Sequence, residues 1–169
     1  LHSPCLFVDV ANGRELGKRH QDSSYRNPEE ADCAIAIVSF LLSKGVQPQS
    51  IGVIAFYSSQ VGQLRQNFAS RRVDEEVRKL IKISTVDGFQ GMECDIIILC
   101  TTRTCRSAGF LRDFRRINVA VTRAKHHLYV LGKKAILEQS NTDFTHMIRH
   151  YEENEGCAIV DSTQLLSSL

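Results

Sequence analysis

The chain of 169 residues lacks the patterns that mark several common classes of protein. None of its six cysteines forms a C-x-x-C pair, so the sequence gives no support to a zinc ribbon or a thioredoxin motif. No apolar run reaches membrane-spanning length, and no signal peptide opens the chain. We therefore expect no membrane partner and a reducing intracellular compartment.

A phosphate-binding loop of the form G-x-x-x-x-G-K-[ST] is also missing. The two Gly-Lys pairs begin at Gly17 and Gly132, and each is followed by a basic residue instead of Ser or Thr. No apolar strand ends in the Asp-Glu pair that would bind Mg²⁺. The net charge of +2 identifies no partner, because a basic groove can lie on a nearly neutral protein.

Short apolar runs alternate with stretches of helical spacing. The runs predict strands at 6–10, 51–56, 95–101, 127–132 and 157–160, and residues 77–84 lead into a further strand. A helix should begin after the capping residue Asn27 and stop at Gly45, and others are expected at 58–68, 118–125 and 144–151, with a loop at 12–27. This alternation predicts a three-layer α/β domain with a mainly parallel sheet. Its ligands should meet the loops after the strand carboxyl ends.

The first candidate site is the segment 84–93, between two predicted strands. Its glycines, Gly88 and Gly91, allow a backbone to come close to a phosphate or a sugar. Asp87, Gln90 and Glu93 add polar groups that a plain hairpin does not need. Taken alone, the segment is equally well explained as a tight loop with incidental acids.

The second candidate is the segment 115–125, where Ile117, Val121 and Ala124 fall on one helical face. Arg116 and Arg123 are among the polar residues on the remainder. An ordinary basic surface helix has the same pattern. Its place between two buried strands, however, predicts that its end lies near the ligand-facing edge of the sheet.

Two further features allow a structural and a functional reading. Tyr57 follows a predicted strand, where an aromatic ring belongs to the core by default but can also stack on a base. His126 and His127 are neighbours on a predicted strand, so their side chains point to opposite faces. We expect no metal site.

Four segments together resemble the late motifs of superfamily 1 helicases. In chain order they are NPEEA, IGVIAFYSSQ, ISTVDGFQGMECDIIIL and RRINVAVTRAK. The resemblance covers about residues 6–132 and is greatest to superfamily 1B, the group that contains the nonsense-mediated-decay helicase and senataxin. It implies a RecA-like, P-loop-NTPase-type domain that binds ATP in a cleft against a second such domain.

The resemblance also implies roles for residues at the nucleotide. Arg123 would be the arginine finger that reaches the γ-phosphate, and Gly91 would approach the phosphates through its backbone. Glu93 would hold the ribose hydroxyls, and Tyr57 would stack on the adenine. Gln90 would link the nucleotide to the nucleic-acid track and would share the catalytic role of Arg123.

Other roles concern the nucleic acid. Thr85 would hydrogen-bond a backbone phosphate of a single strand of RNA or DNA, and Arg103 would lie near that strand. Arg116 and Asn118 would brace the finger helix, with Asp87 as a further supporting residue. Two departures stand out: Arg65 is the first basic residue after Tyr57, so no second phosphate arginine is expected there, and Met92 replaces a residue that is often basic in the family.

On this reading, residues 1–169 form the second motor domain of an ATP-dependent helicase in the nucleus, the cytoplasm or both. The first domain is expected upstream of Leu1 and would supply the Mg²⁺ ligands, so the isolated chain should be inactive. One alternative is a degenerate helicase half that serves as a docking module for nucleic acid or protein. A stand-alone nucleotide-binding enzyme is the other, although the missing phosphate loop argues against it.

Overall fold

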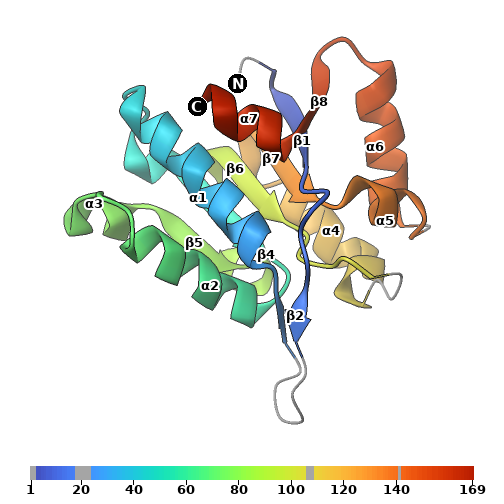
Figure 1. Ribbon diagram of the computed structural model, residues 1–169, viewed down its shortest axis with the longest axis horizontal. Coiled ribbons are helices and arrows are strands. Elements are labelled where there is room, and N and C mark those ends of the chain that lie inside the picture. The colour runs from blue at the N-terminus through green and yellow to red at the C-terminus, as the bar shows by residue number, and fades with distance from the viewer. Residues whose placement is uncertain (1–2, 18–23, 106–108, 141) are drawn as a thin grey trace.

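The computed structural model describes residues 3–17, 24–105, 109–140 and 142–169 as three layers, a sheet between two groups of helices (Figure 1). Within those residues, six parallel strands form the sheet in the order β5-β4-β6-β7-β1-β8. They are β1 (Cys5–Asp9), β4 (Ile51–Ala55), β5 (Lys82–Thr85), β6 (Cys94–Cys100), β7 (Ala124–Gly132) and β8 (Cys157–Asp161). The predicted three-layer α/β fold with a parallel sheet is confirmed.

Helices cover both faces of the sheet, and each face has its own apolar core. One face packs against α1 (Pro28–Ser43), α2 (Ser58–Ala69) and α7 (Ser162–Ser168). The other packs against α4 (Phe114–Val121), α5 (Lys134–Glu138) and α6 (Asp143–Glu153). The described part of the chain contains no helix that combines the length and the apolar character needed to cross a membrane.

Strand β6 lies inside the sheet and contributes to both cores. Ile96 and Ile98 belong to the core on the α1 side, whereas Ile97 and Leu99 belong to the core on the α4 side. Successive side chains on a strand point to opposite faces, so a continuous apolar run suits a strand that is covered on both. The prediction that this run is buried on both faces is confirmed.

The ends of helix α1 follow from its sequence. The Asn27 side chain accepts a hydrogen bond from the Glu30 backbone N–H at 3.1 Å, and Pro28 occupies the first helical position. Beyond the other end, Gly45 has a φ of 83°, a left-handed conformation that glycine adopts without steric cost. The predicted capping residue and the predicted stop are both confirmed.

Several elements differ from expectation. Helix α4 ends at Val121, and Ala124 starts strand β7, so the predicted helix at 118–125 is wrong in its second half. The predicted loop at 12–27 contains β2 (Leu16–Gly17) and β3 (Tyr25–Arg26), which pair in antiparallel fashion. Short elements escaped prediction because they are too brief to show a period: α3 (Glu75–Leu80), α5, α7 and the 3₁₀ helices η1 (Pro48–Ser50), η2 (Asp87–Phe89) and η3 (Gly109–Arg112).

Candidate functional site

The predicted site residues divide between the two edges of the sheet. Because the six described strands of the main sheet are parallel, one edge of this sheet collects their carboxyl ends and the other their amino ends. The register places Ala55, Thr85 and Cys100 side by side at the carboxyl edge. Cys94 pairs with Ala124 at the amino edge. The six steps from Cys94 to Cys100 separate the edges by about 20 Å at the usual rise per residue.

Arg103 follows β6 and forms the centre of the carboxyl edge. Its side chain is only 3% exposed, and its Nε lies 2.9 Å from Glu15 Oε2. Its Nη1 donates to the Tyr57 hydroxyl at 3.3 Å, and its guanidinium carbon lies 4.1 Å from the centre of the Tyr25 ring. The charge of Arg103 is therefore used inside the domain, and in this conformation its guanidinium does not face solvent.

The hydrogen bonds between Arg103 and Glu15 favour the charged forms of both groups. Burial by itself raises the pKa of Glu15, but hydrogen bonds from the Arg103 side chain and the Thr104 backbone outweigh it and lower the pKa below its ordinary value. For Arg103, burial acts to lower the pKa, and the hydrogen bonds to Glu15 and Tyr57 raise it above its ordinary value. Both groups therefore stay charged near neutral pH.

Tyr57 lies at this carboxyl edge, away from the other residues that are predicted to bind the nucleotide. Its ring is 3% exposed and meets Tyr25 edge to face, with 5.4 Å between the ring centres. Tyr57 lies two residues beyond Ala55, whereas Glu93 lies before Cys94 at the opposite edge. The structure therefore does not bring Tyr57 together with Gly91, and its ring face is not open to an adenine.

Two buried polar residues behind this edge were missed by sequence reasoning. Both carboxylate oxygens of Glu30 accept from the Thr102 backbone N–H, at 2.9 and 3.1 Å, and burial raises the pKa of Glu30 to about 8. Gln60 is fully buried and bonds the Asn27 backbone through both ends of its amide. From the sequence, the acids of Asn-Pro-Glu-Glu indicated only favourable charges at a helix start, and nothing there distinguishes buried Glu30 from exposed Glu29.

A second ion pair connects the two motif segments. Arg116 Nη2, on α4, lies 2.7 Å from Asp87 Oδ2, on η2. The Asp87 side chain is 72% exposed, so this pair contributes little to stability, although it connects the two segments. Nearby, the hydroxyl of Thr85 is partly exposed and accepts from the Gly88 backbone N–H at 3.2 Å.

Arg123 lies at the amino edge, directly after helix α4. Its Nε donates to the Val119 carbonyl at 3.0 Å, its Nη1 to the Met92 carbonyl at 3.4 Å and its Nη2 to the Thr122 hydroxyl at 3.3 Å. These partners are all neutral. Among the described residues, no carboxylate lies within ion-pair distance of Arg123, so its positive charge is positioned but not compensated.

The neighbours of Arg123 form an open, polar surface. Gly91 has a φ of 78°, and a Cβ built on it would meet nothing within 4 Å. Gln90 and Glu93 are exposed beside it, and Asn118 is exposed on α4. The Asn118 carbonyl accepts from the Thr122 backbone N–H at 3.1 Å and from its hydroxyl at 2.8 Å. The hydrogen bond from Arg123 to the Met92 carbonyl places Arg123 beside the segment that contains Gln90, Gly91 and Glu93.

The expected position of the ligand-facing edge needs correction. We expected the end of helix α4 near the carboxyl ends of the strands, but α4 runs back from that edge after β6. The Arg123 carbonyl instead accepts from the Cys94 backbone N–H at 3.1 Å, at the amino end of β6. Arg123 also follows the helix and does not belong to it, since the helix ends at Val121.

The fold defines the class of the molecule as a three-layer α/β domain with a RecA-like arrangement. The sequence profile of the family described as AAA domain matches residues 1–135. The chain is 39% identical over 145 residues to Helicase SEN1 of Saccharomyces cerevisiae and 37% identical over 149 residues to ATP-dependent helicase NAM7 of the same yeast. It is 34% identical over 158 residues to Regulator of nonsense transcripts 1 of Caenorhabditis elegans.

The chain belongs to this AAA domain family and is a helicase domain of superfamily 1B. The three alignments cover 82%, 85% and 91% of the chain, in the order given above. The chain spans only 6%, 15% and 14% of the length of these relatives.

Proposed function

We propose that this chain is the second, C-terminal motor domain of an ATP-dependent helicase or translocase that acts on single-stranded RNA or DNA inside the cell. Its amino edge would complete the ATP site against a first RecA-like domain. Its carboxyl edge would hold part of the nucleic-acid strand. The observation that carries this proposal is the uncompensated charge of Arg123, held by three neutral partners beside Gly91 and Glu93.

The residues at the amino edge suit an ATP molecule bound with Mg²⁺. A triphosphate carries several negative charges, and Arg123 offers a positive charge that no described carboxylate neutralises. The open space at Gly91 lets a backbone approach a phosphate, and the exposed Glu93 carboxylate can accept from ribose hydroxyls. Mg²⁺ ligands would come from the first domain, which also would supply the phosphate-binding loop.

The physical role of Arg123 is charge neutralisation. Phosphoryl transfer depends on positioning and on stabilising the charge of the transferred group, and an arginine finger contributes about 10³–10⁵ in rate. Hydrogen bonds to Val119 and Met92 hold the guanidinium before a ligand arrives, so little reorganisation is needed. Because the finger and the phosphate loop would lie on different domains, hydrolysis would require closure of the cleft.

The nucleic-acid role rests on the opposite edge. Thr85 presents a partly exposed hydroxyl there, and Gln90 lies in the segment that joins this edge to the nucleotide residues. Arg103 and Tyr57 are buried and bonded to each other, which suits residues that support the nucleic-acid site without contacting the nucleic acid. The adenine role expected for Tyr57 has no support from this arrangement, and we do not include it.

A phosphate-release assay tests the proposal. The full-length protein should release phosphate from ATP, and faster in the presence of single-stranded RNA or DNA, whereas the isolated 169-residue chain should release none. Strand-stimulated turnover by the isolated chain would contradict the division of the active site between two domains. Absence of turnover in a full-length protein that binds the strand would favour the docking module instead.

A further inference from the structure

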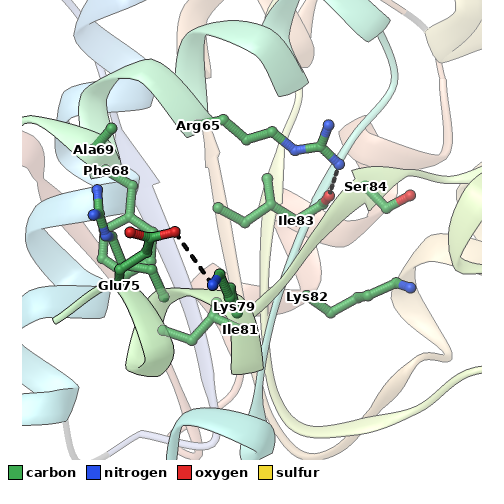
Figure 2. A pocket seen from close by; sticks show the side chains of 10 residues that line it. Arg65, Phe68, Ala69, Glu75, Lys79, Ile81, Lys82, Ile83 and Ser84 are labelled. Carbon is green, nitrogen blue, oxygen red and sulfur yellow. Dashed lines mark hydrogen bonds and ion pairs between the residues drawn. The ribbon is translucent and has the colours of Figure 1, made fainter. Parts of the chain in front are cut away.

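The outer side of the edge strand β5 carries a groove that neither proposed edge site uses. It measures about 510 Å³ and lies between α2, α3 and β5 (Figure 2). Figure 2 shows Arg65 reaching from α2 to the strand, Lys82 and Ser84 on the strand, and the Lys79–Glu75 pair on α3. The wall of the groove thus comes from three elements, of which β5 leads directly into Thr85.

The lining of this groove is predominantly cationic. Four basic side chains and one acid contribute to it, namely Arg65, Arg78, Lys79, Lys82 and Glu75. Glu75 pairs with Lys79 at 3.2 Å and offsets its charge, so Arg65, Arg78 and Lys82 are the basic lining residues that form no ion pair within the described part of the chain. Arg78 Nε is buried, and among the described residues it has no hydrogen-bond partner. The groove therefore offers positive charge to an anionic ligand.

An edge strand can also recruit a partner strand, but this one is obstructed. Arg65 Nη2 donates to the Ile83 carbonyl at 2.9 Å, and the Ile81 N–H donates to the Arg78 carbonyl at 3.3 Å. Incoming backbone would have to displace both contacts, and lysines along an edge disfavour strand addition as well. The contacts favour recognition by charged side chains over β-sheet extension by a peptide.

The groove is continuous with the proposed nucleic-acid edge. Ser84 belongs to its lining and precedes Thr85, and Lys82 lies three residues before Thr85 on the same strand, which is about 10 Å at the usual strand rise. A single strand of nucleic acid that passes Thr85 and bends toward the outer side of β5 therefore reaches this groove directly.

We propose that the groove binds backbone phosphates of the single strand where it leaves the carboxyl edge, and so extends the nucleic-acid track along the flank of β5. This proposal rests on the proposed function, since it requires that a strand crosses Thr85. Contacts of this kind are sequence-independent and depend on salt, because each bound phosphate releases counterions.

The test is strand binding by the full-length protein carrying the double substitution Lys79→Gln and Lys82→Gln. Both lysines are exposed, so the fold should tolerate the change, and Glu75 and Glu76 remain to repel phosphate. The matched control is Arg71→Gln with Arg72→Gln, which removes two exposed charges that line a separate groove. Affinity for a labelled single strand is measured by fluorescence anisotropy over a salt series, and the protected length by nuclease footprinting.

The variant should bind the strand several-fold more weakly than wild type at low salt. Its plot of log affinity against log salt should be shallower by about 1.4, or 0.7 for each lost phosphate contact. Its footprint should shorten at one end, and the control should match wild type. If wild type binds and the variant gives the same slope and footprint, the groove proposal is overturned while the proposed function stands.

Two further outcomes are distinguishable. If wild type binds no single strand at all, the proposed function fails, and this extension fails with it. A polyaspartate peptide serves as a second probe. If wild type binds this peptide, the variant does not, and strand binding is unchanged, the groove recognises an acidic protein segment and the phosphate-track proposal is overturned.

Discussion

The two edges of the sheet use arginine in opposite ways. At the carboxyl edge, Arg103 is buried, paired with Glu15 and hydrogen-bonded to Tyr57, so its charge is satisfied inside the domain. At the amino edge, Arg123 is held by neutral acceptors and keeps its charge uncompensated among the described residues. The first arginine therefore stabilises the domain, whereas the second keeps a positive charge that, under the proposed function, would bind a phosphate group.

Desolvation explains why the same side chain serves both purposes. A buried guanidinium needs a carboxylate and further acceptors, because leaving its charge unpaired away from water is costly. A partly exposed guanidinium keeps water on one side, so backbone carbonyls are enough to position it. Substitutions at each edge should therefore separate into effects on stability and effects on turnover, and four predictions address that division.

The largest effect is expected for Arg123→Ala in the full-length protein. ATP turnover should fall about 10³-fold or more, because the substitution removes the guanidinium that is proposed to neutralise the transferred phosphate. Single-strand affinity and thermal stability should stay near wild type. Steady-state phosphate release, anisotropy and a melting curve measure these three quantities, with Arg123→Lys as the control that retains charge without the planar fork. Unchanged turnover in the alanine variant would remove the finger assignment.

Arg103→Gln should instead act on stability. The substitution leaves the Glu15 carboxylate without its charged partner in a half-buried position, and the free energy of unfolding should fall by about 3 kcal/mol. Urea denaturation measures the loss. Arg115→Gln, at an exposed position, is the matched control and should change stability by less than about 0.5 kcal/mol. Equal effects from the two variants would contradict the contrast between buried and exposed arginines.

Tyr57→Leu distinguishes a structural tyrosine from an adenine platform. Loss of the ring contact with Tyr25 and of the hydroxyl that accepts from Arg103 should lower the free energy of unfolding by about 2 kcal/mol. The KM for ATP in the full-length protein should stay unchanged, since Tyr57 lies at the edge opposite Glu93. Tyr57→Phe keeps the ring and should lose less stability. A several-fold higher KM for ATP in the leucine variant would instead support the role of Tyr57 in stacking on the adenine.

The last prediction concerns a pH dependence of stability that comes from Glu30. Burial raises its pKa from 4.5 to about 8, so between these values the native state holds a proton that the unfolded state lacks. The free energy of unfolding should fall as pH rises through this window, by up to about 1.4 kcal/mol per pH unit, and level off above pH 8.

Glu30→Gln should flatten that slope when urea denaturation is repeated between pH 5 and 8. Glu29→Gln removes an acid from the exposed neighbouring position and should leave the slope as in wild type. If the Glu30 variant keeps the full slope, the buried carboxyl does not carry the proton, and another group behind the carboxyl edge must be responsible.

Much of the fold could be predicted from local pattern. An unbroken apolar run predicts strand β6, and Asn27, Pro28 and Gly45 predict the ends of α1. Both predictions were possible because burial on two faces and helix capping depend on a few adjacent residues. The end of α4 was misjudged because apolar spacing continues to Ala124, although the chain already pairs with β6 there. Strand pairing is a long-range interaction that a local window cannot detect.

The candidate site was predicted as a set of residues but not as an arrangement. The motif segments around Glu93 and Arg123 could be recognised because their residue types and separation are distinctive. Which edge they occupy could not, because the segment after Thr85 crosses from one edge to the other within nine residues. The pairing of Arg103 with Glu15 joins residues 88 positions apart, and nothing in either local sequence indicates it.

The sequence by itself determined the alternation of strands and helices, the family, and the residue types available for chemistry, since each depends on short patterns. Only the tertiary structure decided which charges are buried and which remain for a ligand, because desolvation depends on neighbours brought from distant parts of the chain. It placed Tyr57 behind the carboxyl edge, enclosed Arg103, and left Arg123 at the amino edge without a compensating carboxylate among the residues that the structure describes.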